Sequence, residues 1–388
     1  MFTRKFTTTL VFILFAIISG VSETAAQTAT TFVTGLKSPV KIIYSQRYGV
    51  FFVSEAGMPT TVNTGRISIV GNDGSLSTLI DGLPSGPAAP NNDPSGPSAM
   101  WLDGNSLYIA IGAGNTVLSG PAPGSEIPNP NVASPIFSSI IEMKLPGQGR
   151  LGIGSYQIQP ADHARLATGE TLNLGFGAFR SSLRLAANFP DFTPNPRPDV
   201  PNNVRPSNPF GLVGFGNKLY VADAAQNQIR TVSLVNGNTE IFFQYPSRPN
   251  SLPGPPFIDP VPDSLRVFGN KLLVTFLTGF PFPSGSADIR QIDLDSGAES
   301  QLMGGLTTAI DVLPVANGFC SSFYTLEVST NLAGGAPGRL QRFNSPGGTP
   351  TVISNALVSP TSLALHPSSG DLLVTEIFPG RITRVSGL

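Results

Sequence analysis

Residues 208–245 read NPFGLVGFGNKLYVADAAQNQIRTVSLVNGNTEIFFQY, which is four short apolar runs separated by turns rich in Gly and Asn. Apolar runs of this length, bounded by turn residues, are typical of β-strands. Turns this short join neighbouring antiparallel strands. We therefore interpret the segment as one four-stranded antiparallel sheet.

The same unit recurs along the chain, and its second strand is the easiest part to recognise. The second strands are FFVSEAG from Phe51, LYIAIGAG from Leu107, LYVADAAQ from Leu219, LLVTFLTG from Leu272, FYTLEVS from Phe323 and LLVTEIF from Leu372. Their equivalent positions are 49 to 56 residues apart, except for one gap of 112. Four short strands repeated at this period are the signature of a propeller blade. The sequence therefore predicts an all-β, six-bladed β-propeller with four-stranded antiparallel blades.

The gap of 112 residues leaves two interpretations open. It contains SSIIEMKLPG, a good third strand, but residues 180–209 are rich in Pro, Asn and Arg and show no second strong strand. We therefore expect six blades with a long insertion at about 150–206, and seven blades are the alternative. We further expect RSSLRLAANF (residues 180–189) to form a short helix, and the insertion to cover one end of the central channel.

The two ends of the chain are expected to meet. The last repeat stops after its third strand, RITRVSGL, whereas the lone segment TTFVTGL (residues 30–36) resembles the fourth strands TLIDGL and TVISNAL. This N-terminal strand would complete the last blade and remove an exposed sheet edge. The prediction makes residues 27–388 a single propeller domain.

Residues 1–26 have the composition of a secretory signal peptide. Arg4 and Lys5 are followed by an uncharged apolar run at 9–21 and by small residues up to Ala26. The run is shorter than the roughly 20 residues that a transmembrane helix needs. We expect cleavage near Ala26, a periplasmic or extracellular protein, and no membrane attachment after cleavage; an uncleaved anchor is the alternative.

Composition restricts the partners. The 388 residues include 23 basic and 24 acidic side chains, for a net charge of −1, which argues against nucleic-acid binding. A hydrophobic content of 40% is enough for a large core. Cys320 is the only cysteine in the sequence, so an intramolecular disulfide is excluded. We expect a monomer that binds a small molecule or a protein.

Oxygen-bearing side chains recur where first strands begin and second strands end. Seven are candidate metal ligands: Glu55, Asp223, Glu327 and Glu376 in second strands, and Asn208, Asp263 and Asp311 at first strands. Because the first two strands are antiparallel, these ends share one face around the central channel. Such ligands suit a hard cation, so Ca²⁺ is the only cofactor that the pattern indicates. Capping of the turns is the alternative role.

Several stretches resemble the ScyD/ScyE family, exported NHL-like propellers linked to scytonemin biosynthesis in cyanobacteria. The resemblance covers nearly the whole mature chain. It rests mainly on TGFPFP (residues 278–283) followed by Gly285, and on SNPFGL (residues 207–212). The chain departs from the family at Ser98, where a His is expected after Pro. The resemblance implies a six-bladed propeller with an accessory role in secondary-metabolite biosynthesis.

Two functions are compatible with these patterns. The first is a non-catalytic scaffold for a ligand or partner, because acid–base groups are scarce and the only two histidines, His163 and His366, lie in predicted loops. The second is a metal-dependent hydrolase, a lactonase or a strictosidine-synthase-like enzyme with its site at the central channel. The carboxylates support it, as does PDS at 262–264, which is similar to the PDG element of metal-binding gluconolactonase-like propellers. We favour the first.

Overall fold

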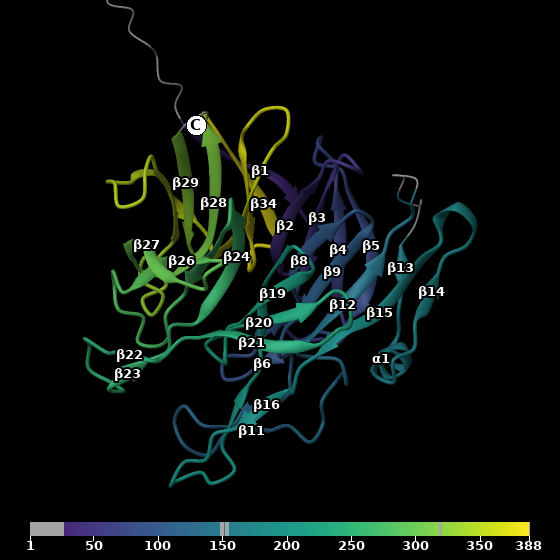
Figure 1. The fold of residues 1–388 in the computed structure, drawn as a ribbon, viewed down its shortest axis with the longest axis horizontal. Helices are drawn as coiled ribbons and strands as arrows, with labels where there is room; N and C mark the ends of the chain where they lie inside the picture. The colour runs from purple at the N-terminus through teal and green to yellow at the C-terminus, as the bar shows by residue number, and fades with distance from the viewer. Residues whose placement is uncertain (1–26, 148–150, 152–154, 318–319, 388) are drawn as a thin grey trace, which may run out of the picture.

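The computed structural model describes residues 27–147, 151, 155–317 and 320–387, so the expected signal peptide at 1–26 lies outside the described residues. The protein is an all-β, six-bladed β-propeller, as the repeat predicts (Figure 1). Among the described residues, no helix is both long and apolar enough to cross a membrane.

Blades 1 to 3 are antiparallel sheets whose main strands follow one another in chain order from the channel outward. Blade 1 contains β2 (Pro39–Ser45), β3 (Val50–Glu55), β4 (Gly65–Val70) and β5 (Leu76–Leu83). Blade 2 contains β8 (Pro97–Asp103), β9 (Ser106–Ile111), β12 (Ser139–Lys144) and β15 (Ser181–Asn188). Blade 3 contains β18 (Pro209–Phe215), β19 (Lys218–Asp223), β20 (Gln228–Ser233) and β21 (Thr239–Gln244).

Blades 4 to 6 complete the ring. Blade 4 contains β24 (Pro262–Phe268), β25 (Lys271–Phe276), β26 (Ala287–Asp293) and β27 (Glu299–Leu306). Blade 5 contains β28 (Ala309–Asn317), β29 (Cys320–Glu327), β30 (Gly338–Phe343) and β31 (Thr351–Leu357). Blade 6 contains β32 (Pro360–Leu365), β33 (Leu372–Glu376), β34 (Arg381–Ser386) and, from the other end of the chain, β1 (Thr28–Thr34).

Closure of the ring is confirmed at two places. Strand β1 pairs antiparallel with β34, with Thr28 opposite Ser386, so the N-terminal strand supplies the fourth strand of blade 6. The first strands also contact one another in a closed order, from β2 through β8, β18, β24, β28 and β32 back to β2. The alternative of seven blades is therefore wrong.

The core lies between neighbouring blades. Successive residues of a strand point to opposite faces of its sheet, and in the ring each face is covered by the next blade. Val53 of blade 1 packs in one cluster with Leu373 of blade 6, and Ile140 of blade 2 packs with Leu212 of blade 3. This two-sided burial explains why the second strands are continuous apolar runs.

The segment RSSLRLAANF is a strand, not the expected helix. It forms β15, the fourth strand of blade 2, and pairs antiparallel with β12, with Ser139 opposite Asn188. Leu183 and Ala187 are buried while Arg184 is exposed, an alternation that suits a strand. The open edge of β12 and the burial beside it outweigh the helix propensity of Leu, Arg and Ala.

The expected insertion at about 150–206 is therefore divided in two by β15. Its first part contains β13 (Tyr156–Gln157), α1 (Pro160–Ala167), β14 (Leu172–Leu174) and a 3₁₀ helix (Gly177–Phe179). Strand β13 pairs with β5 and β14 pairs with β15, the outer strands of blades 1 and 2. This part lies at the rim (Figure 1), so it does not cover the channel as expected.

The second part of the insertion is a hairpin on one face of the disc. First strands begin and second strands end at this face, which we call the hairpin face, because the connections that extend there carry four hairpins. They are β6 (Gly86–Ala88) with β7 (Asp93–Ser95), β10 (Val117–Ser119) with β11 (Glu126–Pro128), β16 (Phe192–Pro194) with β17 (Val204–Pro206), and β22 (Arg248–Pro249) with β23 (Phe257–Ile258). Strands β6, β11 and β16 lie together in Figure 1.

Candidate functional site

Four of the predicted metal ligands form a repeated ion pair. Each is the last residue of a second strand and is completely buried. The pairs are Glu55 with Arg66 (2.6 Å), Asp223 with Arg230 (3.1 Å), Glu327 with Arg339 (2.5 Å) and Glu376 with Arg381 (2.8 Å). Each carboxylate also accepts a backbone N–H from the segment that leads into the first strand; the donors are Lys37, Asn208, Thr307 and Val358. We call this arrangement the blade ion pair.

The blade ion pair has a sequence signal that the carboxylate pattern alone does not reveal. Gly65 and Gly338 begin third strands, and each is followed by the arginine of the pair. A Cβ on Gly65 would lie 2.6 Å from Cδ of Pro97, the first residue of the next blade, and a Cβ on Gly338 would overlap Pro360 in the same way. The dipeptide Gly-Arg at a strand start therefore marks both the close approach of the next blade and the ion pair.

Blade 4 carries its charges differently. Phe276 occupies the end of the second strand, and the carboxylate is Asp288 in the third strand. Asp288 pairs with Arg290 (2.8 Å) and with Arg248 (2.9 Å), which arrives from the β22–β23 hairpin. The Arg248 guanidinium lies 4.8 Å from the centre of the Phe276 ring, a cation–π contact.

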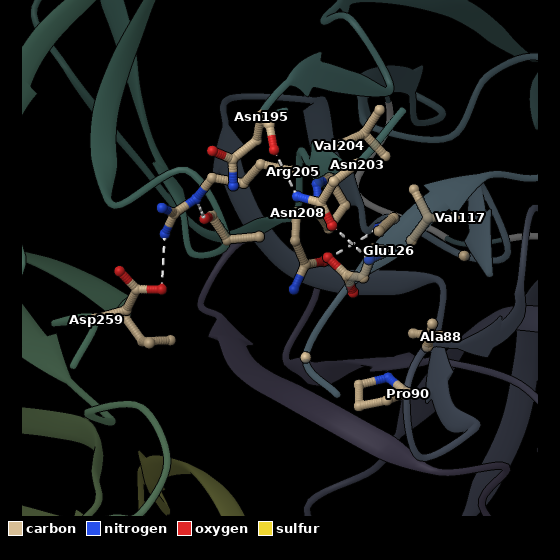
Figure 2. A pocket seen from close by; sticks show the side chains of 17 residues that line it. Ala88, Pro90, Val117, Glu126, Asn195, Asn203, Val204, Arg205, Asn208 and Asp259 are labelled. Atoms are coloured by element: carbon tan, nitrogen blue, oxygen red, sulfur yellow. Dashed lines mark hydrogen bonds and ion pairs between the residues drawn. The ribbon is translucent and has the colours of Figure 1, made fainter. Parts of the chain in front are cut away.

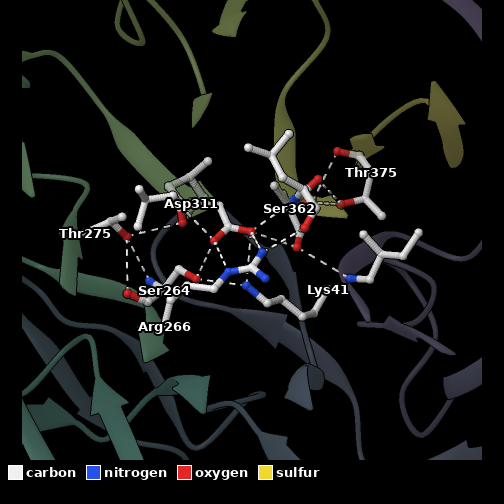
Figure 3. Close-up of polar contacts among 12 residues, drawn as sticks. Lys41, Ser264, Arg266, Thr275, Asp311, Ser362 and Thr375 are labelled. Atoms are coloured by element: carbon white, nitrogen blue, oxygen red, sulfur yellow. Dashed lines mark hydrogen bonds and ion pairs between the residues drawn. The ribbon is translucent and has the colours of Figure 1, made fainter. Parts of the chain in front are cut away.

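Asp311 lies in the central channel, at the centre of a polar network (Figure 3). Its carboxylate accepts from Arg266 (2.7 Å), Lys41 (3.1 Å), Ser264 (2.7 Å) and Ser362 (2.9 Å). The donors come from the first strands of blades 1, 4 and 6, and Asp311 lies on the first strand of blade 5. One carboxylate therefore connects four of the six blades across the axis.

The channel is narrow at this level. A cavity of about 10 Å³ lies between the six first strands, roughly the space of one water molecule. Burial lowers the pKa of Lys41 to about 8. Repulsion by Arg266 lowers this pKa further, whereas attraction by Asp311 raises it. Burial alone would raise the pKa of Asp311, but the charges of Arg266 and Lys41 hold it well below its usual range. Two cations, Lys41 and Arg266, share the single carboxylate of Asp311 here, so one net positive charge remains in the channel.

The three first-strand candidates lie at three different levels. In each blade one first-strand residue faces the last residue of the second strand, as Pro262 does in blade 4. Asn208 comes one residue before the facing residue of its own first strand. Asp263 comes one residue after the facing residue of its strand, and Asp311 comes two residues after. A register shift follows this level in every blade and turns neighbouring side chains in different directions. The seven candidates do not meet at one point.

The described part of the chain contains no group of three or more His, Cys, Asp or Glu side chains that could hold a metal ion. Asp263 is buried; among the described residues it has no charged partner, and its Oδ2 atom has no hydrogen-bond partner there. Burial raises the pKa of Asp263 well above its usual range, against a weaker effect of the Leu277 backbone N–H. A neutral Asp263 carboxyl fits this environment better than an ionised one.

A pocket of about 430 Å³ lies among the hairpins of the hairpin face (Figure 2). Hairpins β6–β7, β10–β11 and β16–β17 contribute to its walls, together with loops of blades 2, 3 and 4. Apolar side chains such as Val117 and Val204 line it beside the polar Glu126, Arg205 and Asn208. Asn208 is the only predicted metal candidate that lines this pocket.

The charged side chains of the pocket differ in how they are paired. The Arg205 guanidinium forms an ion pair with Asp259 at 2.9 Å and donates from Nε to the Ala225 carbonyl. Glu126 donates its backbone N–H to Asn203, at 2.9 Å, but its carboxyl group faces the pocket. Burial raises the pKa of Glu126 to about 7, and the Arg205 charge opposes this only in part.

Polar contacts connect the two hairpins that carry Glu126 and Arg205. The Asn203 side chain accepts from the Glu126 backbone and donates to the Asn195 carbonyl at 2.7 Å. The Arg197 guanidinium donates to the Pro123 carbonyl at 3.1 Å. Sequence reasoning missed this site, because neither hairpin belongs to the repeat. The only signal was a Pro- and Asn-rich segment longer than a blade connection needs.

No family model matches the sequence, and no curated protein matches it. The structure is similar to an auxiliary nutrient binding protein from Bacteroides thetaiotaomicron VPI-5482 (8% identity, TM-score 0.52) and to another from Bacteroides ovatus ATCC 8483 (10% identity, TM-score 0.51). Each match covers 93% of this chain and 76% of the other. A candidate phosphatase from B. thetaiotaomicron is similar at 9% identity and a TM-score of 0.51, over 91% of this chain and 72% of its own. At such identities the similarity shows a shared propeller fold.

Proposed function

We propose that the protein is a non-catalytic propeller that binds a small molecule in the pocket among the hairpins. One observation carries the proposal: hairpins that the six blades do not need for closure enclose about 430 Å³ and place Glu126 and Arg205 at its wall. This volume is within the range of small-molecule sites, and apolar walls with a few polar groups are typical of them. Two proteins of similar fold, described as nutrient binding proteins, are consistent with the proposal.

The alternative, a metal-dependent hydrolase at the central channel, has less support. The second-strand carboxylates that would bind its metal each accept from an arginine. Both histidines bond to backbone carbonyls, His163 to Gly82 at 2.8 Å and His366 to Asn72 at 3.0 Å. Burial lowers the pKa of His163, so it stays neutral on the inner side of α1. These groups have structural partners that account for their positions.

The proposal includes export and a place in the ScyD/ScyE family. The SNPFGL stretch leads into β18, and its Ser207 and Asn208 donate to Asp223 at 2.7 and 2.8 Å. It therefore supplies part of the blade ion pair. The TGFPFP stretch follows β25 on the hairpin face and leaves Phe280 exposed. An exported propeller with these features would serve secondary-metabolite biosynthesis as an accessory that holds a small molecule or a partner.

Blocking the pocket tests the proposal. We expect a panel of sugars, amino acids, amines and carboxylic acids, screened by ligand-observed NMR, to contain molecules that bind the wild-type protein. Ala225→Trp should abolish their binding, because Ala225 lines the pocket. The matched control is Ala336→Trp, at a half-buried alanine in a blade 5 loop of the same face, and it should retain binding. The mass of the exported protein also checks cleavage near Ala26. The proposal is wrong if nothing binds, or if binding survives Ala225→Trp.

A further inference from the structure

Glu126 is the charged group of the pocket whose carboxyl has no partner in the part of the chain that the structure describes. Asp259 is paired with Arg205 and accepts a hydrogen bond from Asn227 at 2.7 Å. The Glu126 carboxyl, by contrast, takes part in none of the hydrogen bonds or ion pairs found between described residues, although it is half-buried. An ionised carboxylate removed from water without a counter-charge is costly. The pocket therefore lacks one positive group beside Glu126.

The surroundings of Glu126 do not supply that charge. Of the charged side chains in the described ranges, Arg205 on β17 is the one that acts on Glu126, and Asp259 already neutralises it. The β6–β7 hairpin faces the pocket with Ala88, Ala89 and Pro90, and the loops after β9 and β19 face it with uncharged residues. With Glu126 ionised, the pocket carries one net negative charge.

We propose that the ligand of this pocket carries a primary ammonium group, with Glu126 as its counter-ion. This inference rests on the proposed function and names the chemical class of its ligand. An ammonium group supplies both the charge and the hydrogen-bond donors that Glu126 lacks. Val117 and Val204 offer apolar surface to the carbon part of the ligand. An anionic ligand would gain little, because Arg205 is already paired, and would be repelled by Glu126.

The pKa of Glu126 determines how binding depends on pH. The carboxyl titrates at about 7 in the free protein because it is buried, and an ammonium group binds its ionised form. Affinity should therefore fall about tenfold for each pH unit below 7 and be constant above it. A ligand that binds the protonated carboxyl would show the opposite dependence.

Three probes of equal length separate the ligand classes: butylamine, butanol and butyrate. We expect butylamine to bind most tightly in NMR titrations from roughly pH 5.5 to 8.5, a range in which it stays protonated, and its affinity to rise with pH as derived above. Glu126→Gln should weaken butylamine binding at least about tenfold at pH 8 and remove the pH dependence. Asp191→Asn is the control, because burial also raises the pKa of Asp191, to about 6, but Asp191 does not line the pocket. It should bind like the wild type.

The outcomes separate this inference from the proposed function. Equal binding of butanol or butyrate, or unchanged butylamine binding by a folded Glu126→Gln variant, overturns the ammonium proposal. In that case the pocket still stands as a binding site if Ala225→Trp abolishes binding. If no probe and no member of the wider panel is sensitive to Ala225→Trp, the proposed function fails, and this inference fails with it.

Discussion

Asp263 and Asp311 show how differently two buried carboxyl groups of similar sequence setting can behave. Both lie near the start of a first strand, in neighbouring blades, and both are fully buried. Asp311 meets two cations and two hydroxyl groups, so it is held ionised. Asp263 meets no cation from the described residues and has one oxygen that is unpaired among them, so burial dominates its pKa. Side chains from other blades decide the difference.

The raised pKa of Asp263 makes it a source of instability at neutral pH. The folded protein holds its proton at pH values where the unfolded chain, with a pKa of about 3.9, has lost it, so stability falls as pH rises. Asp263→Asn removes this titration. We expect it to stabilise the protein by about 1–3 kcal/mol at pH 7 and by much less at pH 4, measured by urea unfolding.

Asp311→Asn is the control of opposite sign. The pKa of Asp311 is lower in the folded protein than in the unfolded chain, so its ionised carboxylate stabilises the fold. This stabilisation is complete at pH values above the pKa of the unfolded chain and is lost as the pH falls through the pKa of the folded protein. This variant should be destabilised at pH 7. An Asp263→Asn variant that is less stable than the wild type at pH 7 would contradict the account of Asp263.

At the scale of elements, the blade ion pair holds the end of a second strand against the start of a third. In blade 5, Glu327 is fully buried and accepts from Arg339 and from the Gln341 amide at 3.1 Å. It also accepts the Thr307 backbone N–H at 2.6 Å, which positions the segment before β28. The pair therefore connects three segments of one blade at the hairpin face.

Removing the cation of this pair should be costly. Arg339→Met leaves the Glu327 carboxylate buried without a counter-charge, which costs about 3–5 kcal/mol for buried pairs. Adding Glu327→Gln should recover part of the loss, because the remaining side chain is then neutral. Urea unfolding of the single and double variants measures both effects. Arg165→Met, at the solvent-exposed pair with Glu170, is the control and should change stability little. Equal effects of Arg339→Met and Arg165→Met would refute the role of the blade ion pair.

At the scale of the whole molecule, the ring depends on a strand contributed by the opposite end of the chain. Strand β1 covers β34 and buries Val33 against blade 6 and the adjoining blade 1. The Leu36 backbone N–H then donates to the Gly380 carbonyl at 3.0 Å. Without this strand, β34 would expose an unpaired edge, and the ring would be closed only by contacts between blades 6 and 1 such as that of β32 with β2.

A truncation tests the closure. A chain that begins at Lys37 lacks β1, and we expect it to aggregate or to unfold over a broad range instead of in one cooperative transition. A chain that begins at Thr28 keeps β1 and is the control, which should unfold cooperatively. Differential scanning calorimetry and size-exclusion chromatography measure both properties. Equally cooperative unfolding of the two chains would show that β1 is dispensable.

The blade number and the closing strand could be predicted from the sequence because they depend on local patterns. Apolar runs such as LYVADAA and turn residues such as Asn217 recur at a fixed period, and residues 30–36 resemble the other fourth strands. Strand β15 could not be predicted in this way. Its composition also suits a helix, and only the open edge of β12 determines its conformation.

The roles of the site residues and the position of the pocket are determined almost completely by the tertiary structure. The carboxylates at the second-strand ends were visible in the sequence, but their roles are determined by arginines and backbone donors that folding brings to them, as Arg339 and Thr307 are brought to Glu327. Glu126 and Arg205 lie far apart in the chain and outside the repeat, and they reach one pocket because neighbouring blades project their hairpins from the same face. The local pattern of a strand determines whether its residues are buried, whereas the charge state of a buried group depends on partners from distant parts of the chain.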